Sequence, residues 1–181
     1  MLNNLKNIWK RFLNDDEDAF EDLYHEYANQ LYSYGMKIVQ DEDLVKDCIQ
    51  EAFIHLIDNK KRIILTPRIH LYLFKSLRNK LYEELRTGKM KAAHNKEAYA
   101  ESPAFEMSLE TTIIESEKFQ EKKKILNKAL EQLTEKQREV LFLRYTEGME
   151  YSEIANILDI DIASVRTLVY RSLKALKCII E

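Results

Sequence analysis

Residue types that carry enzyme chemistry are present in this chain, but their spacing does not match known catalytic patterns. Glu51 and His55 stand four positions apart, whereas helical di-iron sites use Glu-x-x-His in two copies with further glutamates. His25, His70 and His94 have no ligand partner at a spacing typical of metal sites. No Walker sequence or nucleophile elbow is present. The sequence therefore predicts neither an enzyme nor a metal or cofactor site.

A different kind of chemistry is indicated near the C-terminus, where basic and small polar residues share one helix-length segment. Residues 162–180 contain four basic residues and no acidic one. Such a helix can enter the major groove of DNA, with its arginines meeting phosphates or guanine edges. The alternative interpretation of the segment is a solvated basic face on an ordinary helical hairpin. The candidate DNA-contacting residues are Ser164, Arg166, Thr167, Tyr170, Arg171 and Lys174.

The residues that must position this helix form a helix-turn-helix pattern. Residues 151–158 and 162–180 are separated by a short turn, and Asp161 is expected to cap the second helix. The residues spaced to pack the two helices across each other are Ile154, Ala155, Leu158, Ile160, Val165 and Leu168.

A further helix is expected upstream of this pair, beginning at Lys118. The spacing of Thr134 and Gln137 then predicts a capping box, and Gly148 is expected to end the helix that follows. These elements complete a small C-terminal helical domain.

Charge is segregated along the 181 residues, although the formal net charge is only −3. Residues 13–58 carry a net charge of −11, whereas residues 59–96 carry +9. Residues 97–118 are again acidic, with a net charge of −5. A chain that separates its charges in this way can hold a polyanion with one part and repel it from another.

The N-terminal half is expected to form one domain of three helices. Apolar residues at helical spacing run over 18–39, and Asp41 is expected to cap a second helix. Thr66 followed by Pro67 is typical of a helix start and predicts a third helix to about Arg86.

Apolar residues in and around these helices are interpreted as core. The second helix carries a stripe from Leu44 to Ile57, and the third carries one from Tyr72 to Leu85. Phe74, which lies near the start of the third helix, is interpreted as core rather than as a base-stacking residue, as is Tyr72. The residues Trp9 and Phe12 are interpreted as a packing anchor for the N-terminal segment.

Composition indicates the fold class and cellular setting. Only 3 Gly and 2 Pro are present, which favours helix. Cys48 and Cys178 are far apart and do not suggest a disulfide framework, so we expect a reducing, cytoplasmic setting. No apolar run approaches the roughly 18 residues of a membrane span. We expect an all-α protein with domains at 1–90 and 119–181, joined by an acidic linker at 91–118.

Two halves of the chain resemble the two domains of bacterial extracytoplasmic-function (ECF) sigma factors. The C-terminal stretch LTEKQREVLFLRYTEGMEYSEIANILDIDIASVRTLVYRSLKAL resembles their promoter-reading domain. Asp47, Gln50, Glu51 and Phe53 match the D-x-x-Q-E-x-F pattern of the family's core-polymerase-binding helix. The resemblance implies that Asp47, Gln50 and Glu51 bind core RNA polymerase. It also implies that the C-terminal helix-turn-helix recognises the −35 promoter element.

The third helix resembles the family's promoter-melting helix, with matches at Arg78, Asn79 and Arg86. The resemblance implies that Asn79 and the basic loop before this helix capture an unstacked base of the −10 element. Extruding a base costs a few kcal/mol, which the pocket and phosphate contacts must offset. The candidate −10 residues are Lys60, Lys61, Arg62, Lys75, Arg78, Asn79, Lys80 and Arg86.

Four positions depart from the family pattern. Asp159 stands where glycine is usual, and Glu150 stands where a capping Ser or Thr is usual. Glu83 replaces an aspartate, and Leu168 stands where a basic residue is frequent. Asp accepts a left-handed backbone better than most residues do, so Asp159 is compatible with the turn.

The sequence allows two interpretations of the function and two of the linker. A helix-turn-helix regulator with a helical dimerisation domain is the alternative function, although it leaves the Asp47–Phe53 pattern unexplained. The resemblance implies that the linker at 91–118 passes through the polymerase's RNA exit path, as an RNA mimic or as a solvated acidic spacer. A cognate anti-sigma factor is a further candidate partner.

Overall fold

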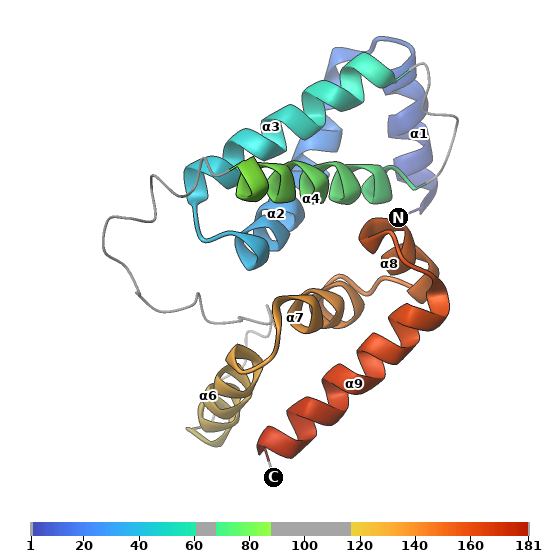
Figure 1. The fold of residues 1–181 in the computed structure, drawn as a ribbon. Helices are drawn as coiled ribbons and strands as arrows, with labels where there is room; N and C mark the ends of the chain where they lie inside the picture. Colours follow the sequence, from blue (N-terminus) through green and yellow to red (C-terminus); the bar gives the residue numbers. More distant parts are fainter. Residues whose placement is uncertain (1, 61–67, 88–116, 181) are drawn as a thin grey trace. The chain divides into compact units, whose positions relative to one another are not determined.

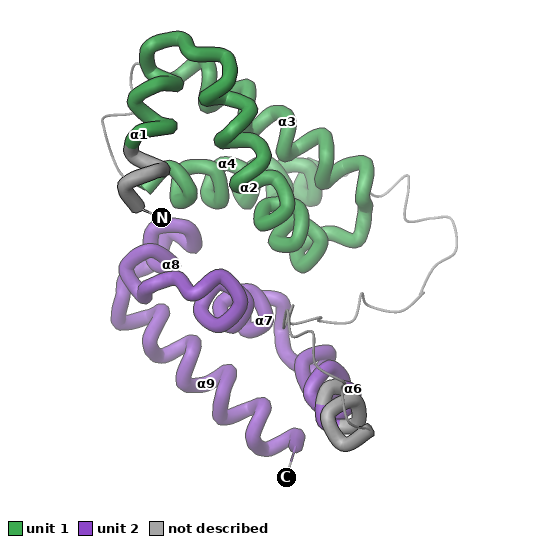
Figure 2. The backbone as a smooth tube through the Cα atoms, turned by 180° about the vertical axis from the view of Figure 1, so that it is seen from behind, with its two compact units in different colours: residues 1–95 green, residues 96–181 purple. Residues whose placement is uncertain are grey.

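A computed structural model describes residues 2–60, 68–87 and 117–180, and within these ranges the ordered elements are all helical (Figure 1). The all-α prediction is therefore confirmed for the described residues. The chain divides into two compact units, residues 1–95 and 96–181 (Figure 2). The division falls inside the predicted linker at 91–118. Nearly all of that segment lies outside the described residues, so both interpretations of its role stay predictions.

Unit 1 contains one helix more than the sequence predicted. Its described helices are α1 (Leu2–Leu13), α2 (Glu17–Ile38), α3 (Glu42–Asn59) and α4 (Ile69–Thr87). The sequence predicted three helices for this domain. That prediction was wrong because it omitted α1, which packs along α2. Trp9 and Phe12 of α1 are buried, which confirms their interpretation as a packing anchor.

The turn from α1 into α2 is held by charge-assisted hydrogen bonds. Arg11 Nε donates to Asp16 Oδ2 at 2.7 Å, and its Nη1 donates to Asp22 Oδ2 at 3.1 Å. Asp16 also caps α2 by accepting from the Ala19 N–H at 3.3 Å. The bond from Arg11 is the main reason that the pKa of Asp16 is lowered. These contacts fix the orientation of α1 relative to α2.

Aromatic rings connect α1 to α3 through α2. The ring centroids of Phe12 and Phe20 are 6.3 Å apart, and those of Phe20 and Phe53 are 5.9 Å apart with an edge-to-face geometry. Tyr34 and Phe74, at 5.1 Å, join α2 to α4 in the same way. Phe74 is fully buried, so its interpretation as core is confirmed. Aromatic pairs of this geometry add to the stabilisation from area burial.

The predicted cap of α3 is confirmed, but two residues that were predicted to be core are exposed. Asp41 caps α3 as predicted, accepting from the Leu44 N–H at 3.0 Å. Ile57, predicted to be core, is 40% exposed, and Leu85 of α4 is exposed while its neighbour Glu84 is buried. Glu84 tolerates burial because a lysine of the same helix, Lys80, lies 3.7 Å away. The proposed cap at residues 66–67 lies outside the described residues.

Unit 2 follows the predicted plan, with one irregular turn added. Its elements are α6 (Glu117–Glu131), α7 (Glu135–Leu141), the π-helical turn η1 (Phe142–Thr146), α8 (Tyr151–Leu158) and α9 (Ile162–Ile180). The capping box at the start of α7 is confirmed, because the Gln137 N–H donates to Thr134 Oγ1 at 3.4 Å and the Thr134 N–H donates to Gln137 Oε1 at 3.0 Å. Gly148 has φ +67° and ends the turn as predicted.

The helix-turn-helix packs as predicted except at Ile160 and Leu168. Ile154, Ala155, Leu158 and Val165 are buried, whereas Ile160 is 40% exposed and Leu168 is half-buried. Asp159 ends α8 with φ 57° and ψ 47°, which confirms that a left-handed residue is needed there. The core position expected for Leu168 is taken by Val169, which is buried.

Gly35 permits the close approach of α2 and α3. A Cβ atom at this position would lie 2.6 Å from Val45 Cγ1, and Val45 is fully buried. Because valine has a stiff, branched side chain, it cannot move aside without disturbing the core. Any larger residue at position 35 therefore pushes the two helices apart.

We expect Gly35→Ala to destabilise unit 1 by up to about 2 kcal/mol, because overpacking of about 1–3 kcal/mol outweighs the roughly 1 kcal/mol gain in helix propensity. The double variant Gly35→Ala/Val45→Ala should be more stable than the sum of the single effects predicts, since it removes the clash. Urea unfolding of the parent, the two single variants and the double variant measures this. A Gly35→Ala variant that is as stable as the parent would contradict the packing argument.

A second prediction concerns Glu147, which follows the π-helical turn and donates its N–H to the Phe142 carbonyl at 3.1 Å. Burial raises the pKa of this carboxyl from 4.5 to about 7. The folded state therefore binds this proton more tightly than the unfolded state, and the contribution of Glu147 to stability falls as the pH rises from about 4.5 to about 7.

Glu147→Gln should thus raise the melting temperature at pH 8 by about 2–6 °C and leave it nearly unchanged near pH 5. Thermal unfolding followed by circular dichroism at both pH values tests this. Exposed Glu135→Gln is the matched control, for which we expect no comparable change in the difference between the two pH values. Equal melting temperatures of parent and Glu147→Gln at pH 8 would show that the carboxyl is not penalised by burial.

Candidate nucleic-acid and partner-binding surfaces

The outer face of α9 presents the residues that the sequence predicted for contact with DNA. Asp161 caps this helix by accepting from the Ser164 N–H at 2.8 Å and from the Ser164 hydroxyl at 2.5 Å. These bonds lower the pKa of Asp161 and order the first turn. The predicted residues Ser164, Arg166, Thr167, Tyr170, Arg171 and Lys174 are all exposed. The structure therefore brings them together on one accessible surface.

Tyr151, which the sequence analysis did not select, lies between two arginines of this unit. Its ring centroid is 4.8 Å from Cζ of Arg144 and 5.8 Å from Cζ of Arg166. Arg144 is itself held, because its Nη1 donates to the Met149 carbonyl at 2.7 Å. The ring thus restrains Arg166 through a cation–π contact. An aromatic residue at the start of α8 was the only sequence indication of this role.

The two remaining departures from the family pattern in this unit have local explanations. Glu150 precedes α8, and its N–H donates to Glu153 Oε2 at 2.9 Å. Glu153 thereby supplies the half of a capping box that accepts from the N–H of the N-cap residue. Leu168 is half-buried, so it serves packing where a basic residue would serve phosphate contact.

The second candidate surface is a polar stripe along α4. At about 100° per residue, positions 75, 78, 79, 82 and 86 fall within a sector of about 100° on this helix. Arg78 lies over the ring of Tyr82, with Cζ 4.6 Å from the centroid. Asn79 and Arg86 are exposed. The stripe joins three of the predicted cations and Asn79 to a tyrosine that the sequence analysis did not select.

Two predicted −10 residues have acidic partners and lie apart from this stripe. Lys60 pairs with Asp15, and its Nζ lies 5.6 Å from the ring centroid of Phe12. Lys80 lies about 140° round the helix from Lys75, and its Nζ is 2.8 Å from Glu51 Oε2 on α3. The sequence placed both lysines in one basic block, but the fold turns them toward carboxylates. Lys61 and Arg62 lie outside the described residues.

The third candidate surface is the exposed face of α3. Asp47 and Gln50 are exposed, and Glu51 is half-buried beside Lys80. Ile54 continues the same face and is 55% exposed. It was missed in the sequence, where the indication was a large apolar residue outside the buried period of the helix. Exposed apolar residues beside charged ones are common in protein-binding surfaces.

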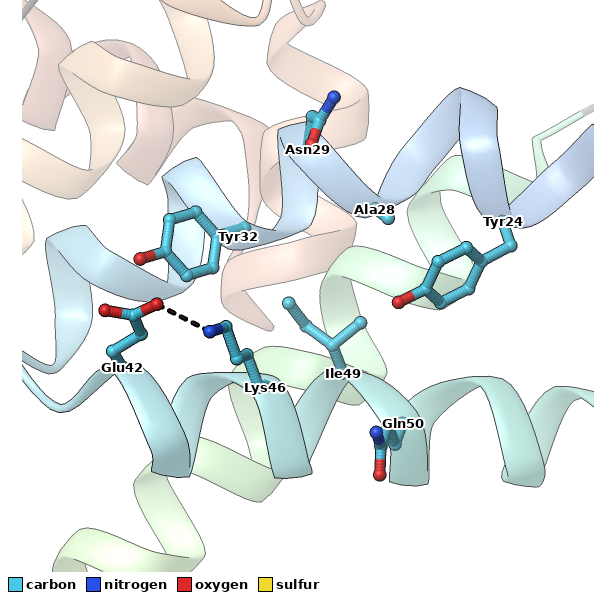
Figure 3. Close-up of a pocket in the computed structure, with 8 residues that line it drawn as sticks. All are labelled: Tyr24, Ala28, Asn29, Tyr32, Glu42, Lys46, Ile49 and Gln50. Atoms are coloured by element: carbon cyan, nitrogen blue, oxygen red, sulfur yellow. Dashed lines mark hydrogen bonds and ion pairs between the residues drawn. The ribbon is translucent and has the colours of Figure 1, made fainter.

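A groove of about 420 Å³ extends this face between α2 and α3 (Figure 3). The Glu42–Lys46 ion pair, at 2.5 Å, lies at one end of it, and Gln50 lines the other part of α3. Ile49 points from α3 toward α2 in this view. The lining residues are Tyr24, Ala28, Asn29, Tyr32, Glu42, Lys46, Ile49 and Gln50.

Among residues 2–60, 68–87 and 117–180, no three His, Cys, Asp or Glu side chains are grouped to hold a metal ion. No helix of the described chain has both the length and the apolar character needed to cross a bilayer. Burial raises the pKa of the Cys48 thiol to about 11, which leaves it protonated and unreactive at neutral pH.

Comparisons with known proteins match both units. The family model for sigma-70 region 2 matches residues 23–90, and that for sigma-70 region 4 matches residues 123–176. The ECF RNA polymerase sigma factor SigM of Bacillus subtilis is 24% identical over 167 residues, which cover 89% of this chain and 94% of SigM. SigW of the same organism is 22% identical over 181 residues, covering 96% of this chain and 95% of SigW. The chain belongs to the ECF group of the sigma-70 family.

Two solved structures, one of them of a sigma factor, share its fold. RpoE of Bartonella quintana, solved in complex with the anti-sigma factor NepR, has a TM-score of 0.64 at 19% identity and covers 88% of this chain and 95% of its own. CnrH, solved in complex with the cytosolic domain of CnrY, has a TM-score of 0.65 at 16% identity and covers 96% and 95%. Both likenesses confirm two helical domains of the sigma type.

This ECF sigma factor therefore binds core RNA polymerase and directs promoter-specific initiation of transcription. The family is not a class of enzymes. The alternative of a helix-turn-helix regulator is less well supported, because region 2 matches the half of the chain that such a regulator would use for dimerisation.

The Tyr151 contacts predict a specific effect on the −35 interaction of this sigma factor. Tyr151→Leu should lower transcription from a −35-dependent promoter about two- to fivefold, because a cation–π contact of about 0.5–1 kcal/mol no longer restrains Arg166. Tyr151→Phe should retain most of the activity, since it keeps the ring. In vitro transcription with core polymerase measures both.

The double variant Tyr151→Leu/Arg166→Ala separates restraint of Arg166 from other roles of the ring. If Tyr151 acts through Arg166, the double variant should transcribe as well as Arg166→Ala alone. A further loss of similar size in the double variant would show that Tyr151 acts independently of this arginine.

Proposed function

We propose that this sigma factor binds a different partner or promoter element with each of the three surfaces described above. The α3 face, with Asp47, Gln50 and Glu51, binds core RNA polymerase. The α4 stripe contacts the −10 element during melting, and the outer face of α9 reads the −35 element. The observation that carries the proposal is the exposure of all six predicted α9 residues on a helix whose apolar side is buried.

The polymerase-binding role of α3 is supported by its charge and accessibility. Its exposed face is acidic, as is the surrounding block of residues 13–58 with a net charge of −11. Such a surface repels DNA and favours a basic protein partner. Ile54 and the groove beside Gln50 add apolar area, so we include both in the proposed interface.

The −10 role of α4 is supported by the polar stripe. Lys75, Arg78 and Arg86 neutralise phosphates, and Asn79 supplies an amide that can donate to and accept from a base edge. Tyr82 lies among these residues and is half-buried. Lys61 and Arg62 precede α4 in the chain and belong to the proposal on sequence grounds alone.

The −35 role rests on α9. Arg166 and Arg171 are the residues best suited to bidentate contacts with guanine, each worth about 1–3 kcal/mol of discrimination. Ser164, Thr167, Tyr170 and Lys174 surround them and can contact phosphates. We propose that the protein acts in the cytoplasm, where polymerase and promoter DNA are found. The anti-sigma factor NepR, which is bound to RpoE in one structural relative, supports control of this chain by an anti-sigma factor.

Run-off transcription with core polymerase on genomic DNA fragments tests the whole proposal. The chain should yield specific transcripts, and Arg166→Ala or Arg171→Ala should reduce them about fivefold or more at promoters that need the −35 element. Loss of preference at one base pair would indicate a base contact, and a uniform loss would indicate a phosphate contact.

The three surfaces can be separated in the same assay. Asp47→Ala/Gln50→Ala should weaken assembly with core polymerase without changing which promoters are used by the holoenzyme that forms. Exposed Lys122→Ala, outside all three surfaces, is the control. Tight, sequence-specific binding of duplex DNA by the isolated chain as a dimer would favour the regulator and contradict the proposal.

A further inference from the structure

Lys80 lies in a cluster of carboxylates that joins α4 to α3. Its Nζ is 2.8 Å from Glu51 Oε2, 3.7 Å from Glu83 Oε2 and 3.7 Å from Glu84 Oε1. Glu51 belongs to α3, whereas the other two carboxylates belong to α4 itself. Lys80 is therefore paired with a residue that is 29 positions away in the sequence and lies on the neighbouring helix.

We propose that Lys80 is a positioning residue for polymerase binding, which holds the Glu51 carboxylate in place on the α3 face and does not contact promoter DNA. This inference rests on the proposed role of Glu51 in the polymerase interface. It assigns to Lys80 a role different from that of the other basic residues of α4.

The geometry leaves Glu51 able to bind a partner while it is paired. Its side chain is 47% exposed, whereas that of Lys80 is only 27% exposed. A carboxylate has about four acceptor positions on two oxygens. The ammonium group of Lys80 approaches Oε2, so acceptor capacity remains for a donor of the polymerase. The lysine thus lies beneath the acidic face rather than in front of it.

Electrostatics explain why Glu51 needs this cation. Asp47 is four residues away on the same helix, and the Glu83 and Glu84 carboxylates of α4 each lie 3.7 Å from the Lys80 Nζ that pairs with Glu51. Without Lys80, like charges would repel the Glu51 carboxylate into several rotamers. The side chain would then lose conformational freedom on binding, which costs affinity. Lys80 reduces this loss before the polymerase arrives.

The same cluster argues against a DNA contact by Lys80. Position 80 lies about 140° round α4 from Lys75, whereas Lys75, Arg78 and Arg86 share the polar stripe. A phosphate that reached Lys80 would have to displace Glu51. It would also lie close to the charges of Glu83 and Glu84, which repel it.

Affinity for core polymerase in the absence of DNA separates the two roles of Lys80. Lys80→Met should weaken binding of the full-length chain about three- to tenfold, and Lys80→Arg should restore most of it. Promoter melting by holoenzyme formed at saturating core polymerase, measured by permanganate reactivity, should stay at the parent level. Lys75→Met is the matched control, and it should show the reverse pattern.

A double-mutant cycle with Glu51→Gln tests the mechanism. If Lys80 acts through Glu51, then Lys80→Met/Glu51→Gln should bind core polymerase as Glu51→Gln does. Circular dichroism and thermal unfolding show whether each variant is folded, and Lys80→Gln replaces Lys80→Met if the latter does not fold. Additive losses in the cycle would overturn the positioning role.

Two other outcomes would also overturn the inference, and they differ in what else they affect. Normal polymerase affinity with reduced melting by Lys80→Met would make Lys80 a DNA contact, while the proposed function would stand. Normal affinity of Glu51→Gln would remove Glu51 from the polymerase interface. In that case the proposed function would fail at this residue, and the role of Lys80 would fail with it.

Discussion

The packing of α3 against both α2 and α4 is the constraint on which unit 1 depends. Close approach to α2 requires Gly35, because a Cβ there would lie 2.6 Å from Val45 Cγ1. The other side of α3 contacts α4, so only one sector of the helix stays accessible. That sector carries Asp47, Gln50 and Ile54. The core thereby determines which residues of α3 can meet core polymerase.

Opposite charges in neighbouring segments of unit 1 are joined by ion pairs between residues that are far apart in the sequence. Lys60 pairs with Asp15 and Lys80 with Glu51, which links the basic block to the acidic one within the domain. Surface ion pairs of this kind contribute little to stability, so their main effect is to hold Lys60 and Lys80 beside carboxylates. The stripe at 75, 78, 79, 82 and 86 lies on another side of α4, with Lys75 about 140° round the helix from Lys80.

In unit 2 the candidate DNA-binding residues are positioned by local backbone geometry, whereas in unit 1 ion pairs position several charged side chains. The left-handed residue Asp159 ends α8, and the Asp161 cap starts α9 two residues later. Tyr151, at the start of α8, then reaches Arg166 on α9. Because these contacts are local, the recognition surface is built by a short segment of chain. This agrees with the strong resemblance of that segment to sigma-70 region 4.

Most of the helices, and the resemblance to the family, could be predicted from the amino-acid sequence alone. Caps at Asp41, Thr134 and Asp161 act through hydrogen bonds within three residues, so their spacing is readable without a structure. The α9 surface was also predictable, because a helix with one buried stripe must expose the residues between. The apolar spacing of Ile8, Trp9 and Phe12 was available in α1, although it was interpreted only as an anchor.

Which of the predicted residues share a surface depends on how the helices pack, and the sequence does not show this. Ile57 is exposed and Lys80 is paired with Glu51 because of how α3 and α4 are rotated and placed against each other. Spacing within one helix carries no information about that rotation. The basic block at 59–96 is continuous in sequence, but its side chains leave the helix in different directions. The fold therefore places Lys75, Arg78 and Arg86 in the polar stripe, whereas Lys60 and Lys80 pair with carboxylates elsewhere in unit 1.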